Sequence, residues 1–184
     1  MLLTDEKLYT AQDYDRLPEG APYQLIEGEL VMTPSPTNLH QDIILNIIEK
    51  LQPFVRRNRL GKLVLSPMDV HLTQIDVFQP DLIFIRAENV HMRRPNDRIR
   101  FAPDLVVEIL SPSTADYDYK RKKEIYCQSG VREYWIVDPD AETIEIMVNE
   151  GGHYRTDAFL RKPALLESAM FPGFSMTVED VFEF

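Results

Sequence analysis

Two short apolar runs in the sequence carry acidic residues where a buried strand would normally have none. Residues 80–85 read PDLIFI and include Asp81, and residues 103–110 read PDLVVEIL and include Asp104 and Glu108. Short runs rich in β-branched residues are typical of core strands. A buried carboxylate is costly unless it is paired, hydrogen-bonded or bound to a metal. The two runs therefore indicate neighbouring strands with a site built into their sheet.

The position of each acid in its run indicates whether it is a site residue or has a simpler structural role. Asp104 and Glu108 would face the same side of their strand, and Glu108 lies deep in the run, where a surface role is hardest to explain. Asp81 opens the other run, so it would meet Glu108 if the strands pair. Converging carboxylates repel each other unless a cation cancels the charge, and Mg²⁺ favours one or two carboxylates. This pattern indicates a metal site at Asp81 and Glu108, whereas Asp104 is more simply the first residue of its strand.

A lysine on the helix that follows the second run is the candidate partner of this site. Asp118, Lys122 and Tyr126 are spaced at i, i+4 and i+8, so they line one stripe of a helix. Lys122 could reach back over the end of the strand that holds Glu108, where an ammonium would stabilise negative charge on a phosphate. The alternative is an ion pair between Lys122 and Asp118 on a solvated helix.

Two further residues are, like Asp118, second-rank candidates. His40 begins a long predicted helix and could be a metal ligand or a base, although a single histidine at a helix end is more often structural. Glu27 precedes Gly28 in a predicted hairpin, where it is either a turn residue or a side chain that enters the cleft.

The remaining pattern predicts an α/β fold in which helices cover both faces of the sheet. The core would contain a helix, three strands, a helix and a strand, with added β-hairpins at both ends. Apolar residues at helical spacing predict the first helix near residues 39–51, with Pro53 kinking it or ending it, and Gly130 is placed to end the second. The strands are expected at 62–72, with a break at Pro67, and at 80–85, 103–110 and 133–138, and the hairpins at 23–32 and 143–155.

Length and composition favour a single domain. The chain has 184 residues, which suits one domain over residues 1–184, with a core of about 23–157. The one cysteine excludes an intramolecular disulfide framework and fits a reducing, cytoplasmic location. We see neither a secretory signal nor an apolar stretch near the ~20 residues that span a membrane, so no membrane association is expected.

The net charge of −10 opposes nucleic-acid binding on average, but the basic residues are clustered. If the fold gathers the clusters, an acidic protein could still present a basic groove; otherwise they are solvated stretches on unrelated surfaces. The cluster in a predicted exposed loop is the candidate DNA contact. The three clusters of four are Arg56, Arg57, Arg59 and Lys62; Arg93, Arg94, Arg98 and Arg100; and residues 120–123.

Several of these segments together resemble the Uma2 family, bacterial proteins assigned to the PD-(D/E)XK nuclease superfamily. The resemblance extends from about residue 23 to residue 157 and is most specific over 103–138. It rests on the segment YQLIEGEL at 23–30, His40, QPDL at 79–82, PDLVVEILSPST at 103–114, Tyr117, Asp118, Lys122, Tyr126, and GVREYWIVDP at 130–139.

The resemblance implies a restriction-endonuclease-like core in which Asp81 and Glu108 match the two metal-binding acids. The superfamily usually has a lysine two residues after the second acid, where this chain has Leu110. In Uma2-type sequences that lysine is placed on the next helix, and Lys122 takes its position here. Gln24 stands where the family often has an acid, which weakens a catalytic role for the first hairpin.

Two functions follow from this resemblance. The first is a metal-dependent DNA endonuclease that uses Mg²⁺ or Mn²⁺, with catalytic residues Asp81, Glu108 and Lys122. The alternative is a catalytically inactive nuclease-fold protein that acts as a nucleic-acid-binding or assembly module, which the acidic net charge and Leu110 favour. By analogy with restriction-type folds, a homodimer would supply one active site for each strand of a duplex.

Overall fold

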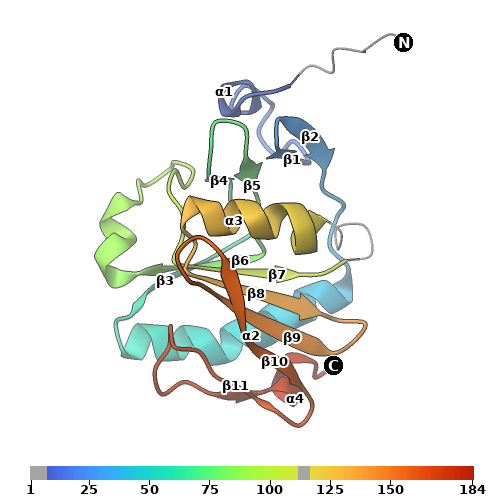
Figure 1. The fold of residues 1–184 in the computed structure, drawn as a ribbon, viewed down its shortest axis with the longest axis vertical. Helices are drawn as coiled ribbons and strands as arrows, with labels where there is room; N and C mark the ends of the chain where they lie inside the picture. The colour runs from blue at the N-terminus through green and yellow to red at the C-terminus, as the bar shows by residue number, and fades with distance from the viewer. Residues whose placement is uncertain (1–7, 112–116) are drawn as a thin grey trace.

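The computed structural model describes residues 8–111 and 117–184, and for residues 117–119 it describes the backbone alone. A mixed central sheet contains β3 (Gly61–Leu65), β6 (Leu82–Arg86), β7 (Leu105–Ile109), β8 (Glu133–Asp138), β9 (Thr143–Asn149) and β10 (Tyr154–Arg161). The six strands lie in the order β10-β9-β8-β7-β6-β3 (Figure 1). β7 and β8 are parallel, and the other neighbouring pairs are antiparallel.

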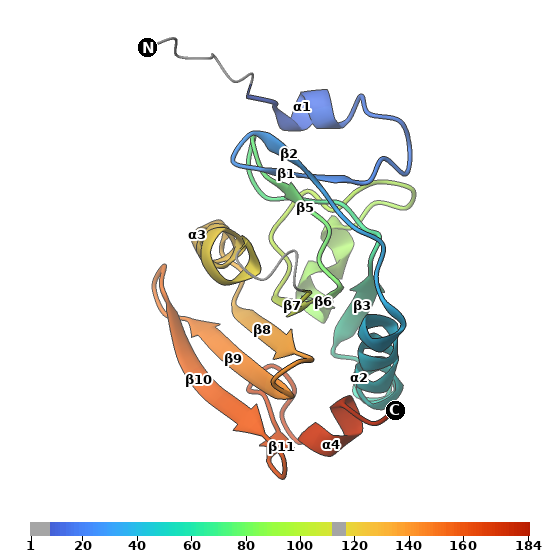
Figure 2. The same ribbon diagram turned by 90° about the vertical axis from the view of Figure 1, so that its right-hand side faces the viewer.

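Both faces of the central sheet are covered. Leu105 and Val107 of β7 pack on the side of α2 (Asn38–Arg57), whereas Val106 packs on the side of α3 (Lys123–Ser129). Figure 2 shows the two helices on opposite sides of the sheet. This double burial explains why β6 and β7 are nearly continuous apolar runs.

The C-terminal segment completes the layer on the α2 side. Phe171 and Phe174 are buried in the same apolar cluster as the inner face of α2. Asn46 of α2 donates a hydrogen bond to the carbonyl oxygen of Val181, at 3.2 Å. The segment contains β11 (Leu165–Leu166), β12 (Met176–Thr177) and α4 (Val178–Val181).

A second, smaller sheet was only partly predicted. It contains β1 (Tyr23–Ile26), β2 (Glu29–Met32), β4 (Val70–His71) and β5 (Val77–Phe78), in the order β2-β1-β5-β4, and α1 (Ala11–Tyr14) packs on it. The predicted hairpin at 23–32 is present, and the predicted strand at 62–72 is broken near Pro67 as expected, but its two halves belong to different sheets. Its first half is β3 of the central sheet and its second half is β4 of the small sheet. The chain changes sheets around Pro67, which lacks the N–H that would continue a ladder.

The predicted α/β restriction-endonuclease-like fold is confirmed, with α2, β3, β6, β7, α3 and β8 in the expected order. α2 continues through Pro53 to Arg57, so the predicted early end is wrong; Pro53 lies on the exposed side of the helix. α3 ends where expected, because Gly130 adopts φ +94° and its N–H bonds to the carbonyl of Cys127. Within the described ranges, no helix combines the length and the apolar character needed to cross a bilayer.

Candidate active site

The pairing of β6 with β7 brings the two acids together. Leu82 pairs with Val107 in antiparallel register, so the next position outward sets Asp81 opposite Glu108. Opposite residues of an antiparallel pair project from the same face, here the α3 side of the sheet. Asp81 and Glu108 both line a cavity of about 840 Å³. The two acids that the sequence singled out therefore share one site.

Glu108 is held by two donors from the helical segment that follows its strand. The carboxylate oxygen Oε1 accepts hydrogen bonds from Lys122 Nζ at 3.0 Å and from the Tyr126 hydroxyl at 2.7 Å. The side chains of Lys122 and Glu108 are each only 4% exposed. Lys122 is therefore a partner of a buried acid and does not lie on a solvated helix face. Leu110, where the superfamily usually has its lysine, packs in the apolar cluster on the same side of the sheet.

A change of helix type lies between these two donors. Residues Tyr117–Lys122 form a π-helical turn, and α3 continues from Lys123 as an ordinary α-helix. Lys122 and Tyr126 are four residues apart across this junction, so both side chains reach Glu108 from one face. The side chain of Asp118, the third member of the predicted stripe, lies outside the described residues. Tyr126 was in the stripe but was not predicted as a site residue, although its spacing from Lys122 was the available signal.

Asp81 is oriented by a backbone amide and by the histidine at the start of α2. Its Oδ2 accepts a hydrogen bond from the N–H of Ile109 at 2.8 Å, and His40 Nε2 lies 3.1 Å from the same oxygen. The helix start is fixed by Thr37, whose hydroxyl accepts from the N–H of His40. His40 therefore lies at the site, within ion-pair distance of Asp81.

Two other acids lie away from this cavity lining. Glu27 is 55% exposed and pairs with Arg121 at 3.4 Å, so it is a turn residue with its side chain on the outer surface. Asp104 accepts hydrogen bonds from the N–H of Arg86 and from the Asn89 amide, at the opposite end of β7 from Glu108. This arrangement agrees with its interpretation as a strand-start residue.

The arginine cluster of the predicted loop divides into two pairs, of which the first is structural. Arg98 Nε lies 2.7 Å from Asp69, and its Nη1 lies 2.9 Å from Asp15. The hydrogen bond to Asp69 is the main reason that the pKa of Arg98 is raised. Arg100 also pairs with Asp15, at 3.1 Å, and with Asp97 at 3.6 Å. These two arginines therefore tie the loop to neighbouring segments.

Arg93 and Arg94 line a second cavity of about 1020 Å³. This cavity shares wall residues with the one that holds Asp81 and Glu108: Gly20, Ala21, Pro67 and Gln79. Within residues 8–111 and 117–184, neither arginine has an ion-pair partner. The second cavity therefore adjoins the acid site and has two arginines in its wall.

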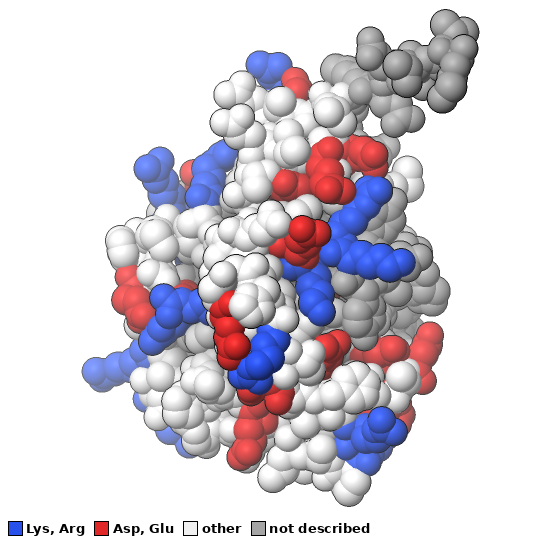
Figure 3. All heavy atoms as spheres, in the orientation of Figure 1, with Lys and Arg blue, Asp and Glu red and all other residues white. Residues whose placement is uncertain are grey.

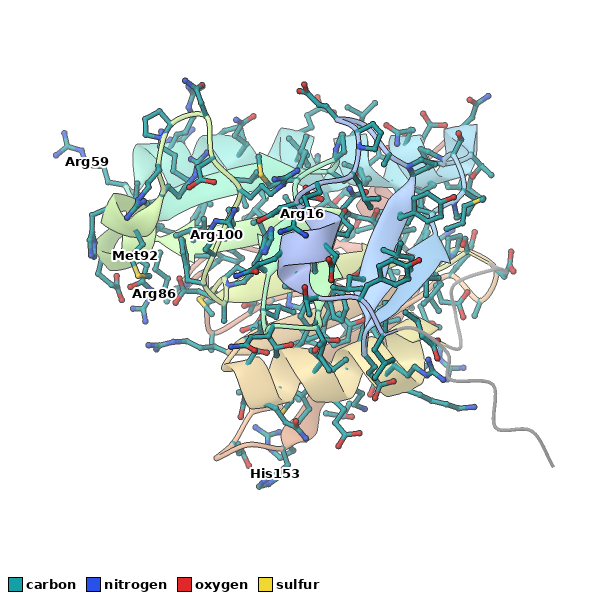
Figure 4. The ribbon with its side chains drawn as sticks, turned by 90° about the horizontal axis from the view of Figure 1, so that it is seen from above. Arg16, Arg59, Arg86, Met92, Arg100 and His153 are labelled. Atoms are coloured by element: carbon teal, nitrogen blue, oxygen red, sulfur yellow. The ribbon has the colours of Figure 1, made fainter. Side chains whose placement is uncertain are left out.

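The three basic clusters do not merge into one surface. Figure 4 shows Arg100 beside α1, whereas Arg59 of another cluster projects from a distant end of the molecule. Arg121 of the third cluster pairs with Glu27 and Glu29. On the face shown in Figure 3, basic side chains of the described residues are interspersed with acidic ones. The interpretation of separate basic stretches therefore fits these clusters better than a single basic groove.

The fold is that of the restriction-endonuclease-like class. The sequence profile of the Uma2 family, described as "Putative restriction endonuclease", matches residues 11–179, and the chain belongs to this family.

One protein is similar to this chain in sequence and one in structure. An uncharacterised protein of Synechocystis sp., sll1609, is 25% identical over 149 residues, which are 79% of this chain and 83% of that protein. A crystal structure of a putative nuclease belonging to DUF820 from Anabaena variabilis superposes with a TM-score of 0.79 at 21% identity. The superposition covers 94% of this chain and 97% of the Anabaena chain, so the architecture is shared over almost the full length.

The side chains at the site can be compared with the ligands that a divalent metal needs. Among the described residues, no three His, Cys, Asp or Glu side chains are gathered closely enough to form a complete metal cage. Mg²⁺ does not need one, because it usually binds one or two carboxylates and keeps waters that a phosphate can replace. Asp81 and Glu108 supply two such carboxylates, and only Oδ2 of Asp81 contacts His40 and the N–H of Ile109. The residues present therefore fit a site completed by solvent and substrate.

Proposed function

We propose that this protein is a metal-dependent endonuclease that hydrolyses DNA phosphodiester bonds at the cavity between β6, β7 and α3. The observation that carries the proposal is the convergence of Asp81 and Glu108 on one cavity, with the buried ammonium of Lys122 3.0 Å from Glu108. Two acids and a lysine are the groups needed to bind a cation and to offset charge on a phosphate.

Asp81 and Glu108 would hold Mg²⁺ or Mn²⁺, which would activate water and stabilise charge at the scissile phosphate. His40 and the N–H of Ile109 fix the orientation of the Asp81 carboxylate, and Tyr126 fixes that of Glu108. Such outer contacts position the ligands of a metal site. Lys122 adds a positive charge, which favours a phosphate in the same cavity.

The adjoining cavity would hold DNA that flanks the scissile bond. Arg93 and Arg94 line it and would contact backbone phosphates, whereas Arg98 and Arg100 hold the loop through their ion pairs. Phosphate contacts of this kind position a substrate without reading its sequence. Cutting both strands of a duplex would need two copies of the site. A homodimer on DNA is therefore part of this proposal, and light scattering of the protein with a duplex tests it by measuring the mass of the complex.

A second candidate is a binding or assembly module that does not cut. It is favoured by the net charge of −10 and by the engagement of Lys122 with Glu108, which ties the ammonium to an acid of its own chain. Calorimetric titration with Mn²⁺ separates the two functions. The enzyme requires Mn²⁺ binding that is lost in Asp81→Asn, whereas a module without a metal site shows no such binding.

The decisive test is a cleavage assay on plasmid and linear DNA with Mg²⁺, Mn²⁺ or EDTA. We expect metal-dependent cutting by the wild type and none by Glu108→Gln. Glu49→Gln is the matched control, because Glu49 is an exposed acid on α2 and the change in charge is the same. Cutting that survives in Glu108→Gln would show that the activity does not come from this site.

A further inference from the structure

Gln24 is a buried polar residue of the small sheet that faces the acid site. It lies on β1, and its side chain is on the opposite face of the strand from Leu25, which packs against α1. Gln24 is only 4% exposed and lines the same cavity as Asp81 and Glu108. The first hairpin therefore contributes to the site through Gln24.

The orientation of the Gln24 amide is determined by its neighbour. The backbone N–H of Gln79 donates to Gln24 Oε1 at 2.9 Å. A backbone N–H can only donate, so this end of the carboxamide is the oxygen and the other end is the NH₂ group. Within residues 8–111 and 117–184, the NH₂ group has no hydrogen-bond acceptor. The NH₂ nitrogen is not sealed from the cavity, so a ligand with an acceptor oxygen can reach it there.

The charges of the cavity indicate which acceptor this is. Asp81 and Glu108 would hold a cation, and a cation together with Lys122 attracts an anionic oxygen. Oxygens of a phosphodiester that do not bind the cation still need donors. The neutral NH₂ group of Gln24 can supply one without competing for the metal.

We infer that Gln24 is a substrate-contacting residue that donates a hydrogen bond from Nε2 to a non-bridging oxygen of the phosphate bound in this cavity. This inference rests on the proposed phosphodiester site and adds a contact from the small sheet. The hairpin at 23–32 would then help to position the substrate.

Two substitutions separate the donor from the structural bond. In Gln24→Glu, a carboxylate oxygen still accepts from the N–H of Gln79, but the donor is lost and a negative charge is added. Gln24→Leu removes the donor without adding charge. Gln52→Glu adds the same charge at an exposed position of α2 and is the control. Binding of a labelled DNA duplex is measured by fluorescence anisotropy in Ca²⁺, and Mn²⁺ binding by calorimetry.

We expect both Gln24 variants to weaken DNA binding by about tenfold or more, the size expected for a hydrogen bond to a charged oxygen. Gln52→Glu should bind DNA like the wild type, and neither Gln24 variant should weaken Mn²⁺ binding. Wild-type DNA affinity in Gln24→Leu overturns the inference, even if Gln24→Glu binds poorly, because charge alone would then explain the loss. If Gln24→Leu binds DNA normally but the wild type binds Mn²⁺ through Asp81, only this inference fails and the proposed function is retained. A wild type that binds neither Mn²⁺ nor DNA overturns the proposed function and this inference with it.

Discussion

Replacing Lys122 with methionine removes the ammonium from a buried ion pair while keeping most of the side-chain volume. Both partners of the pair, Lys122 and Glu108, are 4% exposed and their charged atoms are 3.0 Å apart. Removing one partner of such a pair leaves the other charge buried and costs about 3–5 kcal/mol. That is a large part of the ~5–15 kcal/mol that stabilises a typical domain. For a chain of this length the melting temperature should fall by roughly 6–20 °C.

The structure offers a matched control for this substitution. Lys162 pairs with Glu142 at 2.9 Å, but the two side chains are 38% and 46% exposed. Lys162→Met should therefore cost no more than about 1 kcal/mol, because exposed ion pairs contribute little. The two variants make the same chemical change and differ mainly in burial. Urea denaturation followed by circular dichroism, in EDTA, gives both free energies of unfolding.

Two further measurements refine the comparison. Mn²⁺ should restore more stability to Lys122→Met than it adds to the wild type, because a cation at the two acids replaces the missing positive charge. The double variant Glu108→Gln, Lys122→Met should be more stable than Lys122→Met alone, since it also removes the buried negative charge that lost its ammonium. If Lys122→Met costs no more than Lys162→Met, burial of this pair does not control stability and the reasoning is refuted.

Three more predictions concern the surroundings of the site. Tyr126→Phe removes the 2.7 Å bond to Glu108 and should cost about 1.5–3 kcal/mol in urea titrations while reducing metal-dependent cleavage; unchanged stability would contradict the role of this hydroxyl. Burial holds the pKa of His71 below its ordinary 6.5, so the unfolded chain takes up the proton first as the pH falls. The stability that neutral His71 contributes is therefore present above pH 6.5 and is lost as the pH falls from 6.5 through the lowered pKa. Over that pH range, His71→Gln should lose less free energy of unfolding than the wild type. Parallel plots of unfolding free energy against pH for the two proteins would refute this. Arg98→Met should destabilise the fold, whereas Arg93→Met should keep its stability and weaken DNA binding with a smaller salt dependence; the reverse result would exchange their roles.

Short-range patterns in the sequence were enough to predict most of the central elements. The acid-bearing runs became β6 and β7 because their apolar residues can be buried on both faces of a sheet. Gly130 ended α3, since only a few neighbouring bonds and a positive φ are involved. The pairing that the sequence left conditional, Asp81 beside Glu108, followed once β6 and β7 were adjacent. The sequence therefore supported both the fold class and the candidate acids.

Contacts between distant segments could not be predicted in the same way. The sequence allowed Lys122 to pair with Asp118 on a solvated helix, and only the packing of α3 on the sheet buried it against Glu108. Arg93 and Arg98 looked alike in one loop, until Asp69 and Asp15 were found to bind Arg98. These outcomes depend on segments brought together by the fold, for which local spacing carries no signal.

The sequence by itself determined which side chains were candidates for the site: a pair of acids in two apolar runs, a histidine and a lysine. The tertiary structure decided how they are held and what surrounds them: Tyr126 bonds to Glu108, and Gln24 lines the same cavity. The physical reason is that the cost of burying a charge or a donor is local, whereas the partner that offsets the cost can come from anywhere in the chain.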